Sequence, residues 1–353
     1  MATPSTPPRT GRRQGARGGR RMAARPPARR PSRAPFLVAG WALIVLVGAA
    51  ALVAGALDVG PADLTTGGAV LVSSAYAWAL AARTGGRPVV FGTLALVIGV
   101  AVLLVDSEAL RSGASVLACS ISAVLAVMVT VPAVRVVQAA REVLIAFVVA
   151  AVGAMAAVGF QPLVALGRFE YTTLALAFVL AFVLVYRLGA GFHGLGRRGL
   201  VAIVVGGAGL ASAVAYAELL RRYGTPGLVS SILDAATWSE ANLGAVPRPL
   251  QAVVGVPALM WGCHLRARRR QGWWACAFGV AGLVPVTHVL VDPAFMLRET
   301  LLIEAYSLVV GLAVGVLVIR VDLLLSGSRG RRANRAEQAA AVRPEGGRTR
   351  PLL

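Results

Sequence analysis

The stretch PFLVAGWALIVLVGAAALVAGAL, residues 35–57, holds 23 consecutive residues without a charge. A helix of about 20 apolar residues is long enough to cross the hydrocarbon core of a bilayer. The stretch is too long for the apolar region of a secretory signal peptide, and further apolar segments follow it along the chain. It therefore predicts a first membrane-spanning helix.

The composition extends this prediction to the rest of the chain. Of its 353 residues, 57% are hydrophobic and 14% are charged, whereas soluble domains are roughly a quarter charged and less than half apolar. A surface this apolar belongs in lipid. We therefore expect an all-α fold, a polytopic integral membrane helix bundle.

Ten apolar segments are long enough, or nearly so, to span the bilayer. The second and third are the shortest, and if these two formed a re-entrant hairpin, eight spans would remain with the same sidedness at the ends. The expected spans cover residues 35–57, 66–82, 88–105, 113–134, 142–164, 171–189, 199–220, 249–265, 272–291 and 299–321.

The arginines, which make up all 35 basic residues, test this count independently. Positive residues gather in the cytoplasmic connections of membrane proteins. If the N-terminus is cytoplasmic and ten spans alternate, 29 arginines fall on the cytoplasmic side and six on the outer side. The pattern predicts an even number of spans, both termini in the cytoplasm, and the plasma membrane as the location.

Two arginine-rich tails flank the bundle, which we expect over 35–322. Residues 1–34 and 323–353 have too little apolar content to fold, so we predict disordered cytoplasmic tails. The net charge of +20 is also typical of nucleic-acid binding. However, basic flanks beside membrane spans contact anionic lipid headgroups. The bilayer is therefore the expected partner, and nucleic acid is a minor alternative.

The longest connection, from Arg221 to Arg248, contains a helical repeat near 225–245. Its apolar residues recur at helical spacing, and most of its polar residues fall elsewhere on the helical wheel. Trp238 is suited to the headgroup level. Two interpretations stay open: an amphipathic helix on the outer surface that serves as a lid, or a packing helix that caps the bundle.

Ionisable side chains within the expected spans are few, and such residues face the bundle interior or a cavity because lipid is costly for them. Glu304 in the tenth span and His288 in the ninth lie at similar depth near the outer side. Glu218, Glu170 and Arg298 lie on the same side, so we predict that these five residues line a polar cavity open to the outer face. In the alternative interpretation, charges at span ends only reach the interface, and Glu304 alone has a function.

Lipid gives little apolar driving force between helices, so close packing of small residues holds them together. Gly311 and Gly315 form such a pair in the tenth span. They predict a close crossing with a neighbouring helix and identify no function.

No motif identifies an activity. The chain has no P-loop, HExxH or GxSxG sequence, and its three cysteines show no CxxC spacing; we expect no cofactor and no metal. Three hypotheses remain, in this order. The first is a carrier or flippase for a small molecule or lipid, and the second is a non-catalytic subunit or scaffold of an envelope complex. The third, supported by the outer acids Asp58 and Asp63, is a membrane-embedded transferase that uses a lipid-linked substrate.

Overall fold

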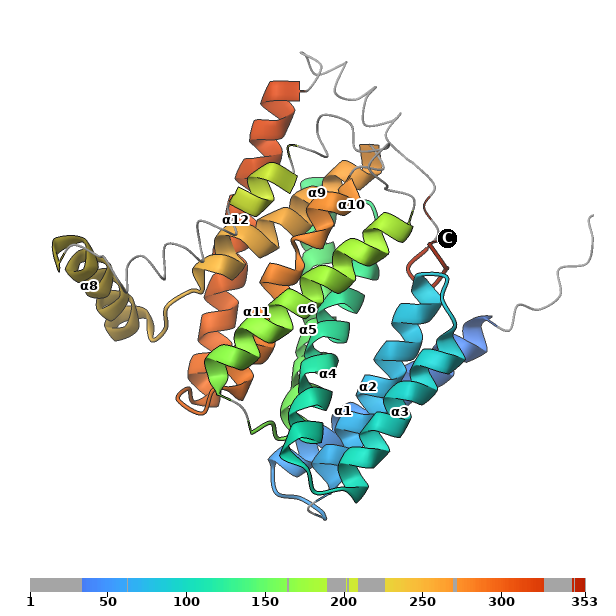
Figure 1. Cartoon of the computed structure of the whole chain (residues 1–353). Coiled ribbons are helices and arrows are strands. Elements are labelled where there is room, and N and C mark those ends of the chain that lie inside the picture. The colour runs from blue at the N-terminus through green and yellow to red at the C-terminus, as the bar shows by residue number, and fades with distance from the viewer. Residues whose placement is uncertain are drawn as a thin grey trace, which may run out of the picture.

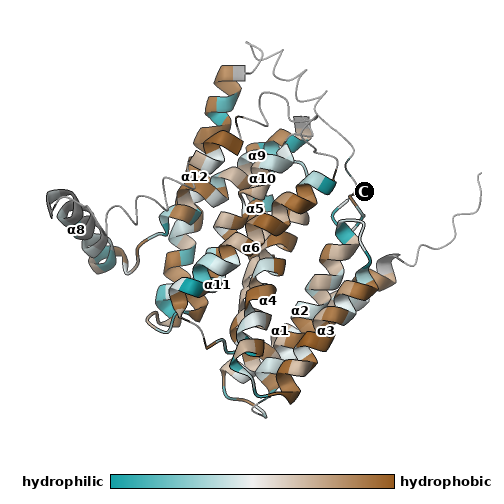
Figure 2. Cartoon of the chain, viewed as in Figure 1, coloured by the Kyte–Doolittle hydropathy of each residue, from teal (hydrophilic) through white to brown (hydrophobic). Residues whose placement is uncertain are grey.

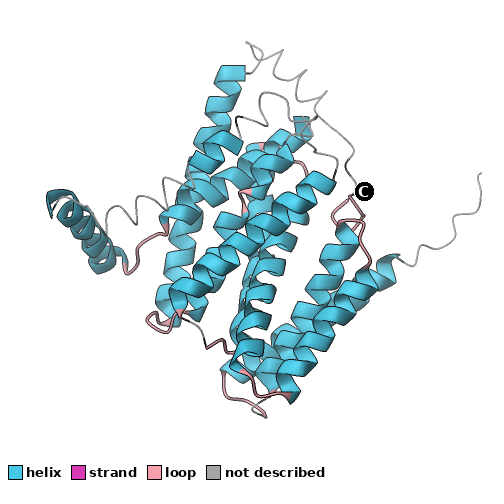
Figure 3. Cartoon of the chain, viewed as in Figure 1, coloured by secondary structure: helices cyan, strands magenta, loops and turns pink. Residues whose placement is uncertain are grey.

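The structure, a computed structural model, describes residues 34–61, 63–163, 165–188, 201, 203–208, 226–268, 272–326, 345 and 347–352. Every regular element in these ranges is a helix (Figures 1 and 3). The expected all-α helix bundle is thereby confirmed. The N-terminal tail, most of the predicted seventh span and Glu218 lie outside the described residues.

Seven helical segments are long and apolar enough to cross a bilayer. They are α1 (Ala34–Ala56), α2 (Leu64–Arg83), α4 (Glu108–Met128), α5 (Val136–Gly159), α6 (Leu166–Arg187), the consecutive pair α10 (Gly272–Ala277) and α11 (Val280–Val291), and α12 (Leu297–Ser326). The remaining elements are α3 (Pro88–Leu104), α8 (Pro226–Leu243), the π-helix η2 (Leu250–Gly255) and α9 (Val256–Arg268). Hydrophobic residues dominate the bundle helices along most of their length (Figure 2).

The expected count of ten spans is not reached within the described part of the chain. The predicted third span, α3, is shorter than the others at 17 residues. The predicted eighth span is divided between η2 and α9. Most of the predicted seventh span is not described. Seven spans are therefore supported by length and composition.

Three helices begin five or six residues before the starts that their apolar runs predict. α4, α5 and α6 begin at residues 108, 136 and 166, whereas the apolar runs predict starts at 113, 142 and 171. Ser107 Oγ accepts a hydrogen bond from the backbone N–H of Leu110 at 3.5 Å, and Gln138 Oε1 accepts one from that of Arg135 at 3.1 Å. Such side-chain bonds satisfy open N–H groups at helix starts, so the first turns of α4 and α5 extend beyond the apolar segment.

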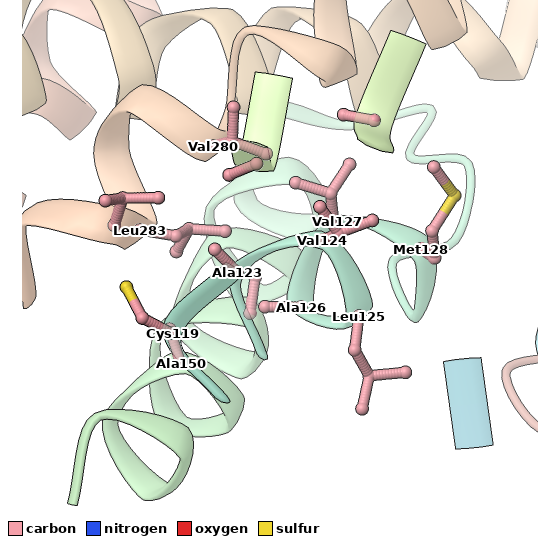
Figure 4. Close-up of a cluster of buried hydrophobic side chains, with 14 of the residues drawn as sticks. Cys119, Ala123, Val124, Leu125, Ala126, Val127, Met128, Ala150, Val280 and Leu283 are labelled. Carbon is pink, nitrogen blue, oxygen red and sulfur yellow. The ribbon is translucent and has the colours of Figure 1, made fainter. Parts of the chain in front are cut away.

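Two helices organise the packing. α2 packs against α1, α3, α4 and α5, while α11 packs against α4, α5, α6 and η2. In Figure 1, α1–α3 form a group on one side of the bundle, and α9 and α12 lie on the other. Figure 4 shows part of the core between them, where Cys119 and Val124 of α4 lie close to Val280 and Leu283 of α11.

Small residues bring several helices into close contact. A Cβ added at Gly311 or Gly315 would lie 2.6 Å from Val256 Cβ or from Met260 Sδ, respectively. The predicted close crossing of the last span is therefore present, and its partner is α9. The closest approach to a backbone atom in the described residues joins η2 and α11, where a Cβ at Gly255 would lie 1.9 Å from the backbone nitrogen of Gly282.

The described spans run alternately between two ends of the bundle (Figure 1). At one, the Arg83 end, Arg83 Nε of α2 donates to the Met128 carbonyl of α4 at 2.9 Å. The other, the Glu304 end, joins the start of α6 to the end of α11 through Glu170 and His288, which approach to 3.8 Å. Contacts at each end thus tie together helices that are distant in the sequence.

α8 occupies the segment where a helix was expected, and it lies clear of the bundle beyond α12 (Figure 1). After α8 the chain turns back toward the bundle at Gly244. The φ of Gly244 is +75°, a backbone conformation that favours glycine at a helix end. The hydroxyl of Tyr306 in α12 donates to the Leu243 carbonyl at 2.9 Å, so the end of α8 is bonded to α12. Because α8 projects outward, it does not cover the bundle in this structure.

Part of the predicted C-terminal tail, Glu345 and residues 347–352, contacts the bundle at the Arg83 end, whereas residues 327–344, 346 and 353 lie outside the described residues. α12 continues to Ser326, and Glu345 pairs with Arg266 while Leu352 N donates to the Arg83 carbonyl. Ion pairs and main-chain hydrogen bonds hold these residues, so the low apolar content of the tail does not prevent docking.

Candidate functional site

Three of the five predicted site residues come together at the Glu304 end: Glu170, His288 and Glu304. Glu218 lies outside the described residues. Arg298 lies in the first turn of α12, where it is exposed and makes no ion pair with another described residue. We call the assembled residues the Glu304 cluster, which consists of Glu170, Thr173, Arg248, Gln251, His288, Glu304 and Ser307.

Glu170 and His288 form the outer part of the cluster. Glu170 Oε1 lies 3.2 Å from Arg248 Nη1 and 3.8 Å from His288 Nδ1. His288 is 4% exposed, and its other ring nitrogen, Nε2, lies 2.8 Å from Thr173 Oγ1. The ring also packs edge-on against Phe169, with centroids 6.0 Å apart. Both imidazole nitrogens thus face polar groups of α6.

Glu304 forms the deeper part, together with a residue of the π-helix. Gln251 Nε2 donates to Glu304 Oε2 at 2.7 Å and to the Gly282 carbonyl at 3.1 Å. Glu304 is 8% exposed and Gln251 is fully buried. Among the described residues, Glu304 Oε1 and Gln251 Oε1 have no hydrogen-bond partner. A buried carboxylate oxygen without a donor is costly, and such unsatisfied groups often mark a functional position.

The local backbone explains how Gln251 reaches both groups. η2 is a π-helical turn, a feature found mostly in short pieces and frequently at functional sites. On the facing helix, Pro285 cannot donate a hydrogen bond to the preceding turn. The carbonyl that loses this donor is that of Ala281, and the neighbouring Gly282 carbonyl accepts from the Gln251 side chain.

Arg248 connects the two parts. Its side chain pairs with Glu170, and its backbone N–H donates to Ser307 Oγ at 2.8 Å, one turn along α12 from Glu304. Arg248 is one of the six arginines expected on the outer side, and Gln251 has no predicted role. Two features of the sequence could have indicated these roles. Pro247 and Pro249 immediately precede the η2 segment, and Gln251 is a polar residue just inside an apolar run.

A separate cavity, whose lining includes Thr84 and Arg187 near the Arg83 end, is mainly apolar. It has a volume of about 360 Å³ and lies among α2, α3, α4 and α6, within the size range of about 300–1,000 Å³ that is usual for ligand pockets. Residues of all four helices line it, including Leu80, Ile98, Leu117 and Leu180. None of the predicted site residues that the structure describes lines this cavity.

Ser120 links the cavity to the Glu304 cluster. It lines the cavity, is fully buried, and its hydroxyl donates to the Thr173 carbonyl at 3.3 Å. Polar contacts therefore run from the half-exposed Glu170 through His288 and Thr173 to the cavity wall.

The acids that supported a transferase lie elsewhere. Asp58 and Asp63 lie in the connection between α1 and α2, and no hydrogen bond or ion pair among the described residues joins either of them to the Glu304 cluster. Within the described residues, no group of three or more His, Cys, Asp or Glu side chains is arranged to hold a metal ion. Comparison with known proteins adds no further constraint, because no family model, curated protein or solved structure matches this chain.

Proposed function

We propose that this protein is a carrier or flippase that moves an amphipathic small molecule or a lipid across the plasma membrane. The observation that carries the proposal is the line of polar contacts from Glu170 to Ser120, which ends at an apolar cavity among membrane-spanning helices. The cavity suits an apolar chain. The cluster behind its wall suits a polar group that enters the membrane with that chain.

Two further features agree with transport. Helices interrupted within the membrane are a recurring property of carriers, and here a turn at residues 278–279 separates α10 from α11. Following the arginine distribution, we assign the Arg83 end to the cytoplasm and the Glu304 end to the outer side. Glu304 is then the group whose loss or gain of a proton accompanies movement of the substrate.

Transport by purified protein in liposomes tests the proposal. Fluorescent phospholipids in both leaflets are quenched from outside with dithionite, and uptake of apolar solutes is measured in parallel. Ala95→Phe places a ring in the cavity, which Ala95 lines, and should reduce transport by at least tenfold. Val97→Phe on the same helix is the control because Val97 is 59% exposed and does not line the cavity.

Glu304→Gln tests the coupling role separately. Glutamine preserves the shape and one hydrogen bond of the side chain but removes its ionisation. We expect transport to lose its dependence on a pH difference across the liposome membrane. Glu299→Gln, five residues earlier on α12, is the matched control. If no lipid or solute moves through the wild-type protein, or if both glutamine variants transport like wild type, the carrier proposal fails.

α8 favours the second hypothesis, a membrane subunit of an envelope complex. The helix lies clear of the bundle, and its Trp238 is 60% exposed; exposed aromatic side chains are common anchors at interfaces. Under this alternative, a partner protein co-purifies in mild detergent and is lost in Trp238→Ala. Under the carrier proposal, the same variant transports normally.

A further inference from the structure

The C-terminal segment, Glu345 and residues 347–352, docks on the Arg83 end of the bundle. Glu345 Oε2 lies 2.7 Å from Arg266 Nη2, and Arg348 Nη2 lies 2.9 Å from Glu142 Oε1. Arg83 Nη1 donates to the carbonyls of Gly347 and Arg350. The segment thus contacts charged residues from α2, α5 and α9 at once.

Three arginines bind consecutive carbonyls beneath this segment. Arg83 Nε donates to Met128 O at 2.9 Å, Arg348 Nη1 to Val129 O at 3.1 Å, and Arg266 Nη2 to Thr130 O at 3.0 Å. The last carbonyls of a helix have no partner within the helix and attract cations. The end of α4 therefore gathers the three guanidinium groups side by side, two from the bundle and one from the segment.

The two guanidiniums of the bundle are deeply buried. Arg266 is 0% exposed and Arg83 is 4% exposed. Arg266 also lies over the ring of Trp273, with its central carbon 3.5 Å from the ring centroid. A buried charge is unfavourable unless it is paired, and the bundle's own acid at this place, Glu142, is already paired with Arg348. Glu345 is therefore the carboxylate that pairs with the bundle's arginines.

The pairing is incomplete. Arg83, Arg266 and Arg348 carry three positive charges, and Glu142 and Glu345 carry two negative charges, so one positive charge is left among these described residues. In addition, Arg83 Nη2 and Arg266 Nε have no hydrogen-bond partner among the described residues. Both unsatisfied atoms are donors on buried cations, and an anion with several acceptor oxygens would satisfy them and offset the remaining charge.

We propose that Arg83 and Arg266 form a binding site for a phosphate group, and that Glu345 and the tail carbonyls occupy this site when no phosphate is bound. Guanidinium groups bind phosphate through paired hydrogen bonds. Phosphate supplies more acceptor oxygens than a single carboxylate. The segment acts as a displaceable plug, and its removal opens the site at the Arg83 end. This inference stands independently of transport.

Calorimetric titration of the purified full chain in detergent, with inorganic phosphate as the probe, tests the site. Phosphate can bind only to molecules whose site is not occupied by the segment. The apparent affinity for phosphate is therefore proportional to the fraction of such molecules. Glu345→Gln removes the competing carboxylate and should tighten phosphate binding by about tenfold. Glu240→Gln, an equal charge change on the exposed part of α8, should leave the affinity unchanged.

Loss of a site arginine should weaken phosphate binding, whereas Glu345→Gln should tighten it. Arg266→Gln should weaken phosphate binding by at least tenfold. Because Arg266 is buried, that variant can fail to fold, and Glu345→Gln then decides alone. The proposal is overturned if phosphate up to about 10 mM binds neither wild type nor Glu345→Gln, or if both bind it equally.

A short-chain phosphatidic acid distinguishes the two sources of the phosphate group. If it binds at least tenfold more tightly than inorganic phosphate, and Glu345→Gln tightens both, the ligand is a lipid headgroup at the membrane surface. Equal affinities with the same response to Glu345→Gln identify a soluble phosphate. If phosphatidic acid binds while Glu345→Gln leaves its affinity unchanged, the lipid does not use this site and the proposal is wrong.

Discussion

The crossing between η2 and α11 gives a sharp prediction of stability. A Cβ added at Gly255 would lie 1.9 Å from the backbone nitrogen of Gly282, whereas non-bonded heavy atoms are most favourable at about 3.5–4.0 Å. The atoms that the added Cβ would meet are backbone atoms of Ala281 and Gly282, so no side chain can rotate to relieve the contact. In Gly255→Ala the helices must separate by more than about 1 Å, which also breaks the 3.1 Å hydrogen bond from Gln251 Nε2 to the Gly282 carbonyl.

The magnitude follows from three contributions. Overpacking costs about 1–3 kcal/mol, and the lost hydrogen bond costs about 1 kcal/mol. Replacing a helical glycine with alanine recovers about 0.5–1 kcal/mol. The free energy of unfolding should therefore fall by roughly 2 kcal/mol, measured by far-ultraviolet circular dichroism as sodium dodecyl sulfate is added to detergent micelles.

Gly113→Ala on α4 is the matched control, because nothing lies within 4 Å of the added Cβ. It should raise the unfolding free energy by about 0.5–1 kcal/mol. If Gly255→Ala is as stable as Gly113→Ala, the two backbones do not approach closely, and the positioning of Gln251 by this crossing is refuted.

Three further predictions follow from particular contacts. Arg348→Gln removes the charged partner of the buried Glu142 and should lower the unfolding free energy by about 1–3 kcal/mol; wild-type stability would show that the C-terminal segment is not docked. Gly315→Ala meets a methionine side chain rather than backbone, so it should cost less than about 1 kcal/mol and less than Gly255→Ala in the same assay. A membrane-impermeant maleimide applied to intact cells should label Ser107→Cys but not Arg135→Cys, and the native cysteines add little background because all three are buried; the reverse labelling pattern would invert the assigned orientation.

The helices follow from the sequence because each depends mainly on its own apolar run. Their starts were predicted less well. Apolar content ends at the membrane core, whereas α4 begins at Glu108 and includes Arg111 in its first turns. By hydropathy alone, the residues from Glu108 to Arg111 belong to a connection. They can still form a helix, because Ser107 caps it and water or headgroups surround its first turn.

The site was predicted in part, for a related reason. Glu170, His288 and Glu304 are ionisable residues near span ends, which made them visible individually. Their partners were not visible, because contact depends on which helices become neighbours. Gln251 and Glu304 are 53 residues apart, and Arg248 and Glu170 are 78 residues apart. An arginine beside an apolar run is indistinguishable in sequence from one that faces solvent.

The described part of the C-terminal tail, Glu345 and residues 347–352, makes contacts that its composition does not predict. A tail with little apolar content cannot build a core of its own, and the expectation of disorder follows if the tail must supply all of its own stabilisation. Here the bundle supplies it. The end of α4 presents open carbonyls to Arg348, and Arg266 presents a buried charge to Glu345. A short polar segment can then be held by the unmet hydrogen-bonding needs of the surface on which it docks, and those needs exist only after α2, α4, α5 and α9 have assembled.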